Sequence, residues 1–243
     1  AHGATYKGRR VGTFGDAVAF SLQAQKTLTG GEGGVLLTDN DEIFYRALLL
    51  GHHNKRCKKE IPEEHPLQQY AVTGMGLKLR IHPIAAAIAD EQFDNLENIL
   101  EGRRKIAKKI VEEFEDLPGI EVPNIPNDIK PSWYAFVMQY KQEELENLSV
   151  DKFHKALLAE GCNELDRPGS TCPLNLLSLF QKPEMLFSNY RGKISYQKGD
   201  FPIAERFHER SLKLPVWHDP RDEEIVNMYI KAFKKVIGGY KEL

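Results

Sequence analysis

One lysine of this chain, Lys26, lies between an apolar segment and a glycine-rich turn. Ser21 and Gln23 precede it, residues 30–34 form the turn Gly-Gly-Glu-Gly-Gly, and a second apolar segment follows at 35–38. A primary amine held at such a turn can form a Schiff base with an aldehyde, as in enzymes that use pyridoxal 5'-phosphate (PLP). The hydroxyl of Ser21 and the amide of Gln23 are groups that can hold a phosphate. An ordinary turn with a solvated lysine fits the same spacing, so this pattern alone leaves both interpretations open.

Three blocks of sequence place this turn in a wider pattern. The first consists of AHGATYKGRRVGTFGD (1–16) and FSLQAQKTLTGGEGGV (20–35), the second is GLKLRIHPIAAA (76–87), and the third contains AER (204–206) and LKLPVWH (212–218). In this order they resemble the DegT/DnrJ/EryC1/StrS family of sugar aminotransferases and cover most of the chain. The glutamine of the first block and the start of the second are most similar to the inosose and keto-sugar aminotransferases.

The resemblance implies an α/β fold, that of the fold-type I PLP-dependent transferases to which aspartate aminotransferase belongs. In this fold a mixed, mostly parallel seven-stranded sheet forms a large domain, and a small α+β domain at the C-terminus closes over the site. We expect residues 1–102 to be the remainder of the large domain and residues 103–243 to be the small domain. Because the chain begins at Ala1 inside the first block, the acidic partner of the PLP pyridine nitrogen would precede it. We therefore expect a fragment or a processed chain.

The resemblance also assigns roles around the turn. Lys26 matches the family's Schiff-base lysine, Ser21 its phosphate-binding serine, and Gln23 a polar position near the cofactor. Sugar dehydrases built on this fold have histidine at the position of Lys26, so the lysine favours transamination over dehydration. Once freed from the cofactor, the lysine amine would move a proton between the substrate carbon and the cofactor.

Two basic residues of the second block, Lys78 and Arg80, match a family segment of the form Gly-x-Asn-x-Arg, with lysine in place of the commoner asparagine. In the family this segment reaches across a dimer interface to the PLP phosphate of the neighbouring subunit, and a basic side chain suits that anion. A homodimer with shared active sites is therefore implied. A solvated basic turn before a helix is the alternative.

Two histidines are candidate substrate contacts. His218, after Leu-Pro-Val-Trp, corresponds to the family's histidine beside the site, and His52 lies in a polar segment that could border the substrate entrance. We expect no metal at His52 and His53, because adjacent residues do not face one site and no carboxylate or cysteine completes a ligand set around them.

Composition narrows the function classes. The 243 residues carry 33 basic and 35 acidic side chains, and the net charge of −2 gives no reason to expect a nucleic acid or an anionic membrane as a partner. No apolar run approaches the ~20 residues that span a bilayer. The cysteines, Cys57, Cys162 and Cys172, are odd in number and lack metal-type spacing, which indicates reduced thiols and a cytoplasmic protein.

These observations support a first hypothesis, a PLP-dependent aminotransferase that moves an amino group from glutamine or glutamate to a keto-sugar or a keto-cyclitol. The second hypothesis is a non-catalytic or regulatory protein with the PLP fold, or one half of a split enzyme, because a ring without its acidic partner is a poorer electron sink. A PLP-dependent sugar dehydrase is a weaker third hypothesis, which Lys26 disfavours.

The apolar pattern predicts the elements that must position these residues. We expect neighbouring strands at 16–21 and 35–38, a helix at 42–50, an exposed loop at 51–66, and one long helix at 83–117 with a bend or break near 101–102. Beyond it we expect strands at 120–122 and 133–141, a helix at 150–160 closed by Gly161, a loop-rich stretch at 168–199, and helices at 202–213 and 221–238.

Overall fold

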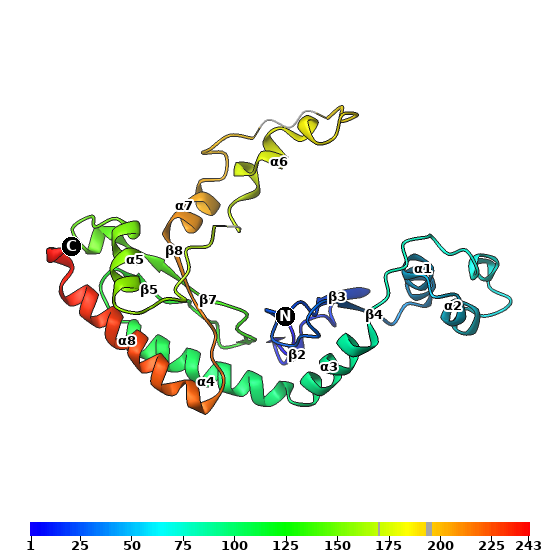
Figure 1. The fold of residues 1–243 in the computed structure, drawn as a ribbon, viewed down its shortest axis with the longest axis horizontal. Helices are drawn as coiled ribbons and strands as arrows, with labels where there is room; N and C mark the ends of the chain where they lie inside the picture. The colour runs from blue at the N-terminus through cyan, green and yellow to red at the C-terminus, as the bar shows by residue number, and fades with distance from the viewer. Residues whose placement is uncertain (170, 193–195) are drawn as a thin grey trace. The chain divides into compact units, whose positions relative to one another are not determined.

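The chain folds into two units in the computed structural model, which describes residues 1–169, 171–192 and 196–243 (Figure 1). One unit consists of Ala1–Glu101 with Ile125–Tyr134, and the other of Gly102–Asn124 with Ala135–Leu243. Helix α4 (Leu96–Phe114) runs from the first unit into the second. The chain thus returns once to the first unit before it completes the second, and the domain division after residue 102 stays a prediction.

An antiparallel pair of strands, β3 (Ala17–Ser21) and β4 (Gly34–Thr38), carries the glycine turn in the first unit. The predicted strands and their pairing are confirmed, with Phe20 opposite Val35 and Ser21 opposite Gly34. The resemblance implies a larger sheet in this domain, and the described residues contain this pair of its strands. A second small sheet places β1 (Thr5–Tyr6) between β2 (Arg9–Arg10) and β6 (Ile129–Lys130).

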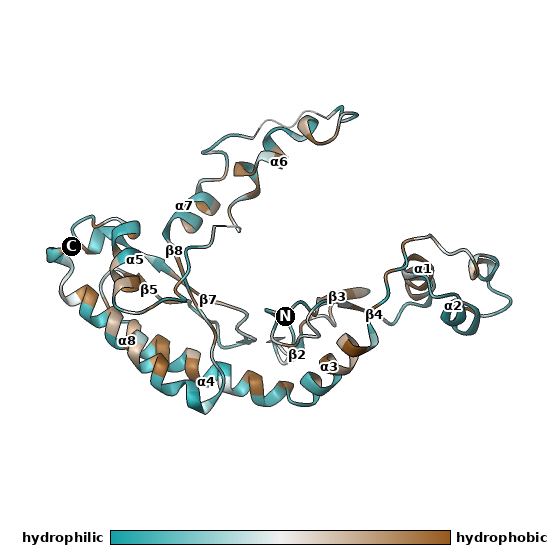
Figure 2. Cartoon of the chain, in the orientation of Figure 1, coloured by the Kyte–Doolittle hydropathy of each residue, from teal (hydrophilic) through white to brown (hydrophobic). Residues whose placement is uncertain are grey.

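A small apolar core holds the glycine turn against helix α3 (Pro83–Asp94), along which Figure 2 shows hydrophobic residues. Its buried members are Leu22, Leu28, Ala89, Leu96 and Leu100. Leu22 and Leu28 lie on either side of Lys26 in the sequence, so their burial fixes the path of the chain around it. Because burial of one leucine side chain stabilises a fold by about 1.5–3 kcal/mol, this core is a main support of the turn.

The long helix predicted at 83–117 is two helices, α3 and α4. They separate at Asn95, which takes φ −95° and ψ 3°, outside the α-helical region. The Asn95 side chain accepts a hydrogen bond from Asn98 Nδ2 at 2.8 Å. The predicted interruption of the helix exists, but its predicted position near Gly102 is wrong, because α4 continues through that residue. A Cβ at Gly102 would overlap the carbonyl oxygen of His218, so this glycine permits close packing instead.

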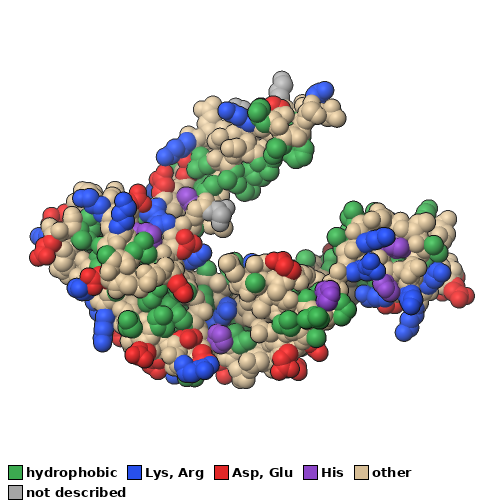
Figure 3. Space-filling model, viewed as in Figure 1, with side chains coloured by type: hydrophobic (Ala, Val, Ile, Leu, Met, Phe, Trp, Pro, Cys, Tyr) green, Lys and Arg blue, Asp and Glu red, His purple; other side chains and the backbone are tan. Residues whose placement is uncertain are grey.

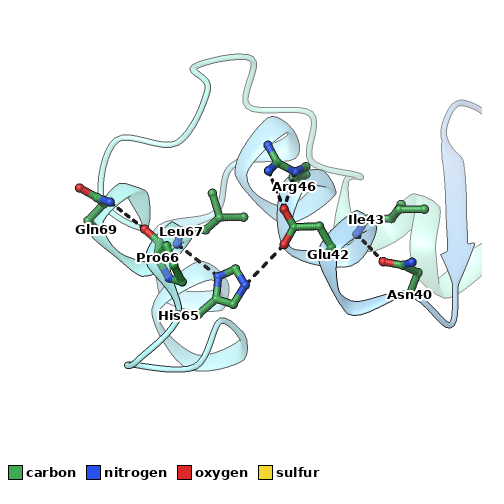
Figure 4. A network of polar contacts seen from close by, with 8 residues as sticks. All are labelled: Asn40, Glu42, Ile43, Arg46, His65, Pro66, Leu67 and Gln69. Atoms are coloured by element: carbon green, nitrogen blue, oxygen red, sulfur yellow. Dashed lines mark hydrogen bonds and ion pairs between the residues drawn. The ribbon is translucent and has the colours of Figure 1, made fainter.

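Helix α1 (Asp41–Gly51) confirms the helix predicted at 42–50. Asn40 caps it, since its side-chain oxygen accepts a backbone N–H of the first turn at 3.1 Å. Figure 4 shows this cap together with two contacts of Glu42, which accepts from Arg46 Nε at 2.7 Å and lies 3.4 Å from His65 Nε2. These polar contacts tie the start of α1 to the segment that follows it.

The segment at 51–66 is largely helical, so the exposed loop predicted there is wrong. Helix α2 (Asn54–Glu60) begins soon after α1, and a short 3-10 helix, η1 (Pro66–Tyr70), closes the segment. A buried cluster holds them together, formed by Leu49, Cys57, Ile61 and Ala71. Only one of these apolar residues lies within α2. Because its neighbours in the helix are polar, hydrophobic periodicity does not predict α2.

The second unit is built on an antiparallel three-stranded sheet in the order β5 (Ile120–Glu121), β7 (Phe136–Tyr140) and β8 (Ser211–Leu214). Helices α5 (Val150–Ala159) and α8 (Glu223–Gly238) confirm two predicted helices and contact one another (Figure 1). Among the described residues, none of the helices is both long and apolar enough to cross a membrane.

The predicted helix at 202–213 ends early, as α7 (Pro202–Arg210), because β8 begins at the next residue. In β8, Leu212 and Leu214 are fully buried and lie opposite Met138 and Phe136 of β7, a period-two pattern that a strand satisfies and a helix does not. The remaining short helices are η2 (Gln142–Glu144), η3 (Leu174–Leu176), α6 (Ser178–Gln181), η4 (Pro183–Met185), η5 (Pro220–Asp222) and η6 (Tyr240–Glu242). Part of the predicted loop-rich stretch, residues 170 and 193–195, lies outside the described residues.

A buried carboxylate joins this stretch to α7. Glu205 is 5% exposed, and its oxygens accept hydrogen bonds from the N–H groups of Gly199 at 2.8 Å and Phe201 at 3.3 Å and from Asn175 Nδ2 at 2.8 Å. Burial by itself raises the pKa of Glu205, but these hydrogen bonds outweigh it and hold the pKa below its usual value. The glutamate of the third sequence block is therefore a structural connector within the second unit.

Candidate active site

The backbone of Leu22 closes the loop that carries Lys26. Its N–H donates to the Gly33 carbonyl at 2.9 Å, and its own carbonyl accepts the Gly30 N–H at 3.0 Å. The Thr29 hydroxyl donates to the same carbonyl at 3.0 Å. Because Leu22 is also buried in the core, the loop starts and ends at one anchored residue.

Two glycines let this loop approach the neighbouring chain closely. A Cβ at Gly30 would come nearer to Ala85 O than the 3.0 Å that real Cβ atoms keep, and would lie 3.1 Å from Ala85 C. Gly33 takes φ +150°, and a Cβ there would lie 3.0 Å from Ile81 Cδ1. The glycine run that predicts a turn therefore also brings the loop against the start of α3.

The Lys26 side chain is partly buried and lies over an aromatic ring. Its Nζ is 4.0 Å from the centroid of the Tyr134 ring, a cation–π geometry. Across the residues described, no carboxylate forms an ion pair with Lys26. Among these residues, no ion pair with a carboxylate would therefore have to break before the amine attacks an aldehyde.

Tyr134 reaches Lys26 through the pairing of β6 with β1, which holds the segment at 125–134 on the first unit. A hydrogen bond from the Lys7 N–H to the Asp128 carbonyl at 2.7 Å extends this pairing. Tyr134 belongs to the strand predicted at 133–141, and its position beside Lys26 was not predicted. No local pattern carries that signal, because the two residues meet only through pairing between distant segments.

Ser21 and Gln23 lie at the start of the loop and keep donor groups available. Ser21 Oγ accepts the Gln23 N–H at 3.3 Å, and Gln23 Oε1 accepts the Gln25 N–H at 3.0 Å. The backbone thus uses both side chains as acceptors, while the Ser21 O–H and the Gln23 amide N–H groups can still donate. Such donors near a lysine suit an anionic group such as a phosphate.

His2 is a further residue near Lys26 to which sequence analysis gave no role. Its ring stacks on Phe20 at a centroid distance of 5.2 Å and an interplanar angle of 26°. Burial lowers the pKa of His2, and the positive charge of Lys26 lowers it further. Its buried Nε2 has no hydrogen-bond partner in the part of the chain described. A buried nitrogen without a partner is uncommon and leaves a polar atom available to a bound group.

Lys78 and Arg80 are exposed, and within the described ranges neither forms an ion pair or a side-chain hydrogen bond. Lys78 takes φ +51°, a left-handed conformation that few non-glycine residues adopt. Ile81, next in sequence to Arg80, lies beside Gly33, so the segment leads to the loop of Lys26. The structure does not join either basic side chain to the loop, and their role in phosphate binding stays a prediction.

The two candidate histidines lie in different units. His52 ends α1 with φ +33°, packs closely against Gly74, and has a buried Nε2 without a partner in the described structure. His218 is exposed in the second unit, where its N–H donates to Asp222 Oδ2 at 3.1 Å. Their contact with a substrate stays a prediction.

Comparison with known proteins bears on the family. A sequence model of the DegT/DnrJ/EryC1/StrS aminotransferase family matches residues 1–231. An uncharacterized protein of Methanocaldococcus jannaschii is 32% identical over 237 residues, which are 97% of this chain and 57% of that protein. The L-glutamine:scyllo-inosose aminotransferase of Streptomyces griseus is 28% identical over 250 residues, which cover 100% of this chain and 58% of that enzyme.

A solved structure bears on the fold. The aminotransferase from Psychrobacter cryohalolentis superposes with a TM-score of 0.77 at 21% sequence identity, over 98% of this chain and 60% of that one. The expected α/β fold of the fold-type I transferases is confirmed, and the chain spans little more than half the length of its curated relatives. It belongs to the DegT/DnrJ/EryC1/StrS aminotransferase family.

Proposed function

We propose that this chain is the lysine-bearing part of a PLP-dependent aminotransferase that moves an amino group from glutamine or glutamate to a keto-sugar or a keto-cyclitol. The observation that carries the proposal is Lys26, a partly buried amine without a carboxylate partner among the described residues, in a loop anchored by Leu22. Family membership supports transamination. The glutamine and the inosose in the name of the Streptomyces griseus relative support the donor and the class of acceptor.

The residues around the loop fit the chemical groups of PLP. Lys26 would hold its aldehyde carbon, while the Ser21 hydroxyl and the Gln23 amide would donate to its phosphate. His2 Nε2, buried and without a partner in the described structure, could meet a polar substituent of the ring. When bound, PLP supplies an electron sink for the pair of electrons left when a proton leaves the substrate carbon.

Lys26 would carry out the proton transfer. Its Nζ, when free, can accept a proton from the substrate carbon and return it as a general acid. The loop must keep this atom within reach throughout, and it is fixed at Leu22 and by the burial of Leu28. Small displacements of such a group reduce rates strongly, so the apolar support of the loop matters for chemistry as well as for stability.

A homodimer is the assembly that would give Lys78 and Arg80 a phosphate to bind. The segment around them is exposed and alternates basic with apolar residues. Its large apolar side chains are more than half exposed, at 63% for Met75, 58% for Leu77 and 66% for Leu79. Exposed apolar patches of this kind are typical of protein interfaces, and the two cations suit an anion bound on the other subunit.

Reduction of the protein with borohydride in the presence of PLP tests the proposed activity. We expect a visible absorption band on mixing, its loss on reduction, and a cofactor-modified peptide that contains Lys26. Lys26→Arg should abolish the modification, and the exposed Lys55 of α2 should stay unmodified in the same digest. A reduced protein that carries no cofactor on Lys26 would contradict the proposal.

The surface of the first unit favours a second candidate, a non-catalytic protein or one half of a split enzyme. In the described structure β3 and β4 pair only with each other, and an isolated two-stranded sheet is marginal in water. Val35, Leu36 and Leu37 are 40–52% exposed, and an open apolar cavity of 730 Å³ lies over the face with Phe20. Figure 3 shows hydrophobic side chains at the surface near α3. Further polypeptide on this face would complete the site.

A fluorescent dye that binds exposed apolar surface separates the two candidates. If the 243-residue chain acts with further polypeptide, it should bind the dye strongly and take up PLP weakly. A chain that is monodisperse, leaves the dye dark and is fully modified at Lys26 would exclude the second candidate. The wild-type chain and Lys26→Arg should bind the dye equally, because Lys26 lies in the loop and not among the exposed apolar residues of the strands.

A further inference from the structure

The contact between Lys26 and Tyr134 belongs to no function assigned so far. We propose that Tyr134 is a positioning residue for Lys26, whose aromatic face holds the protonated ε-amine whenever that amine is not bonded to a cofactor. The inference rests on the proposed function for its meaning in catalysis. The contact itself exists in the chain without any cofactor.

The geometry is that of a direct cation–π contact. Lys26 Nζ lies 4.0 Å from the centre of the Tyr134 ring, well inside the ~6 Å over which such contacts attract. Aromatic rings attract the ammonium form and not the neutral amine, because the attraction is electrostatic. The ring therefore favours one position of the charged side chain.

The charged groups of the described residues do not hold the Lys26 ammonium in position. In the described residues no carboxylate pairs with Lys26, and the positive charge of Lys26 adds to burial in lowering the pKa of the nearby His2. Among the described residues, the Tyr134 ring lies against Nζ.

The backbone supports the placement of the ring. Pairing of β6 with β1 brings the segment to the loop, and Trp133, directly before Tyr134, takes φ +50°. A bulky residue in the left-handed region is strained and persists where its surroundings impose it. Tyr134 is 52% exposed, so its ring contributes little to the core, and its substitution should leave the fold intact.

This contact has a use in a proton-transfer cycle. When Nζ has accepted a proton, the ring holds the resulting ammonium in the loop and keeps it from swinging into solvent. When the amine must react, it has to leave the ring and lose its proton. Tyr134 would therefore slow the capture of aldehydes by the cofactor-free chain and retain the lysine during turnover.

Chemical modification of Lys26 in the cofactor-free chain tests the proposal without any activity assay. The protein is treated with trinitrobenzenesulfonate at one mildly alkaline pH, and the rate of modification at Lys26 is followed by mass spectrometry. Tyr134→Leu should raise the rate about two- to fivefold, the factor expected from a cation–π contact at an exposed site. Tyr134→Phe keeps the ring and should match the wild type, and Tyr134→Trp, with the stronger ring, should be slower.

Lys55 of α2 serves as the internal control, because it is exposed and lies in the same unit. Its rate should be equal in all four proteins. The proposal is overturned if Tyr134→Leu reacts at the wild-type rate, or if Tyr134→Phe or Tyr134→Trp reacts as fast as Tyr134→Leu. If Tyr134→Leu loosens the fold and accelerates both lysines, the comparison of Tyr134→Trp with the wild type decides.

The test of the positioning role of Tyr134 and the test of the proposed aminotransferase can succeed or fail independently. If the modification rate of Lys26 depends on the ring but borohydride fixes no cofactor, the positioning role is supported and the aminotransferase is refuted. If borohydride fixes the cofactor on Lys26 but the modification rate of Lys26 does not depend on the ring at position 134, the aminotransferase is supported and the positioning role is refuted. For an active enzyme, Tyr134→Leu should lower kcat with little change in KM, and Tyr134→Phe should restore it.

Discussion

Replacement of Gly30 by alanine would show whether the loop that carries Lys26 depends on its close approach to α3. The new methyl group would come within 3.0 Å of the Ala85 carbonyl oxygen and lie 3.1 Å from its carbon. Both atoms belong to the backbone of the first turn of α3, so no side-chain rotation relieves the overlap. Either the loop or the start of the helix must move by several tenths of an ångström.

The size of the effect follows from two opposing terms. Overpacking of a well-packed site costs about 1–3 kcal/mol, whereas alanine in place of glycine restricts the unfolded chain and stabilises the fold by about 0.4–1 kcal/mol. The first unit of Gly30→Ala should therefore be less stable by about 1–2 kcal/mol. At a urea dependence of about 2 kcal/mol per molar, its unfolding midpoint should fall by roughly 0.5–1 M.

Pulsed hydrogen exchange with mass spectrometry at increasing urea concentration measures each unit separately. Peptides that contain β3, the loop and α3 report on the first unit, and peptides of α5 and α8 report on the second. Gly238→Ala is the matched control, since a Cβ there meets open space and alanine favours the helix, so the first unit should not change. An unaltered midpoint for the first unit of Gly30→Ala, or an equal shift in both units, would refute the packing argument.

Two further predictions concern the second unit. Glu205→Gln should speed amide exchange around Gly199 at neutral pH. Because the pKa of Glu205 is lowered in the folded chain, its carboxylate stabilises the fold above the ordinary glutamate pKa, and this stabilisation disappears as the pH falls through the lowered value. The variant and the wild type should therefore converge in acid, and a difference that persists there would contradict the argument. Burial raises the pKa of the Cys162 thiol to about 11, so iodoacetamide at mildly alkaline pH should alkylate the partly exposed Cys172 much faster than Cys162, whereas equal rates would show that Cys162 is accessible.

Local elements were predictable where their causes are local. The strands β3 and β4 are short apolar runs bounded by glycine, and they follow one another along the chain with the loop of Lys26 between them. The start of α1 follows from the capping side chain of Asn40. The helix α2 was not predictable in this way, because its one buried residue, Cys57, needs Leu49 and Ala71 from other segments to bury it. The strand β8 was missed for the same reason, since its partner β7 is distant in the sequence.

The sequence by itself determined the reactive group of this protein and its immediate setting. Lys26, Ser21 and Gln23 lie within one short segment beside a glycine turn, so the covalent chain alone brings them close, and their residue types define the chemistry. Only the tertiary structure decided what the amine faces. The ring of Tyr134 reaches Lys26 because β6 pairs with β1. Pairing between distant segments depends on the free energy of the whole fold, and the spacing of residues along the chain does not predict it.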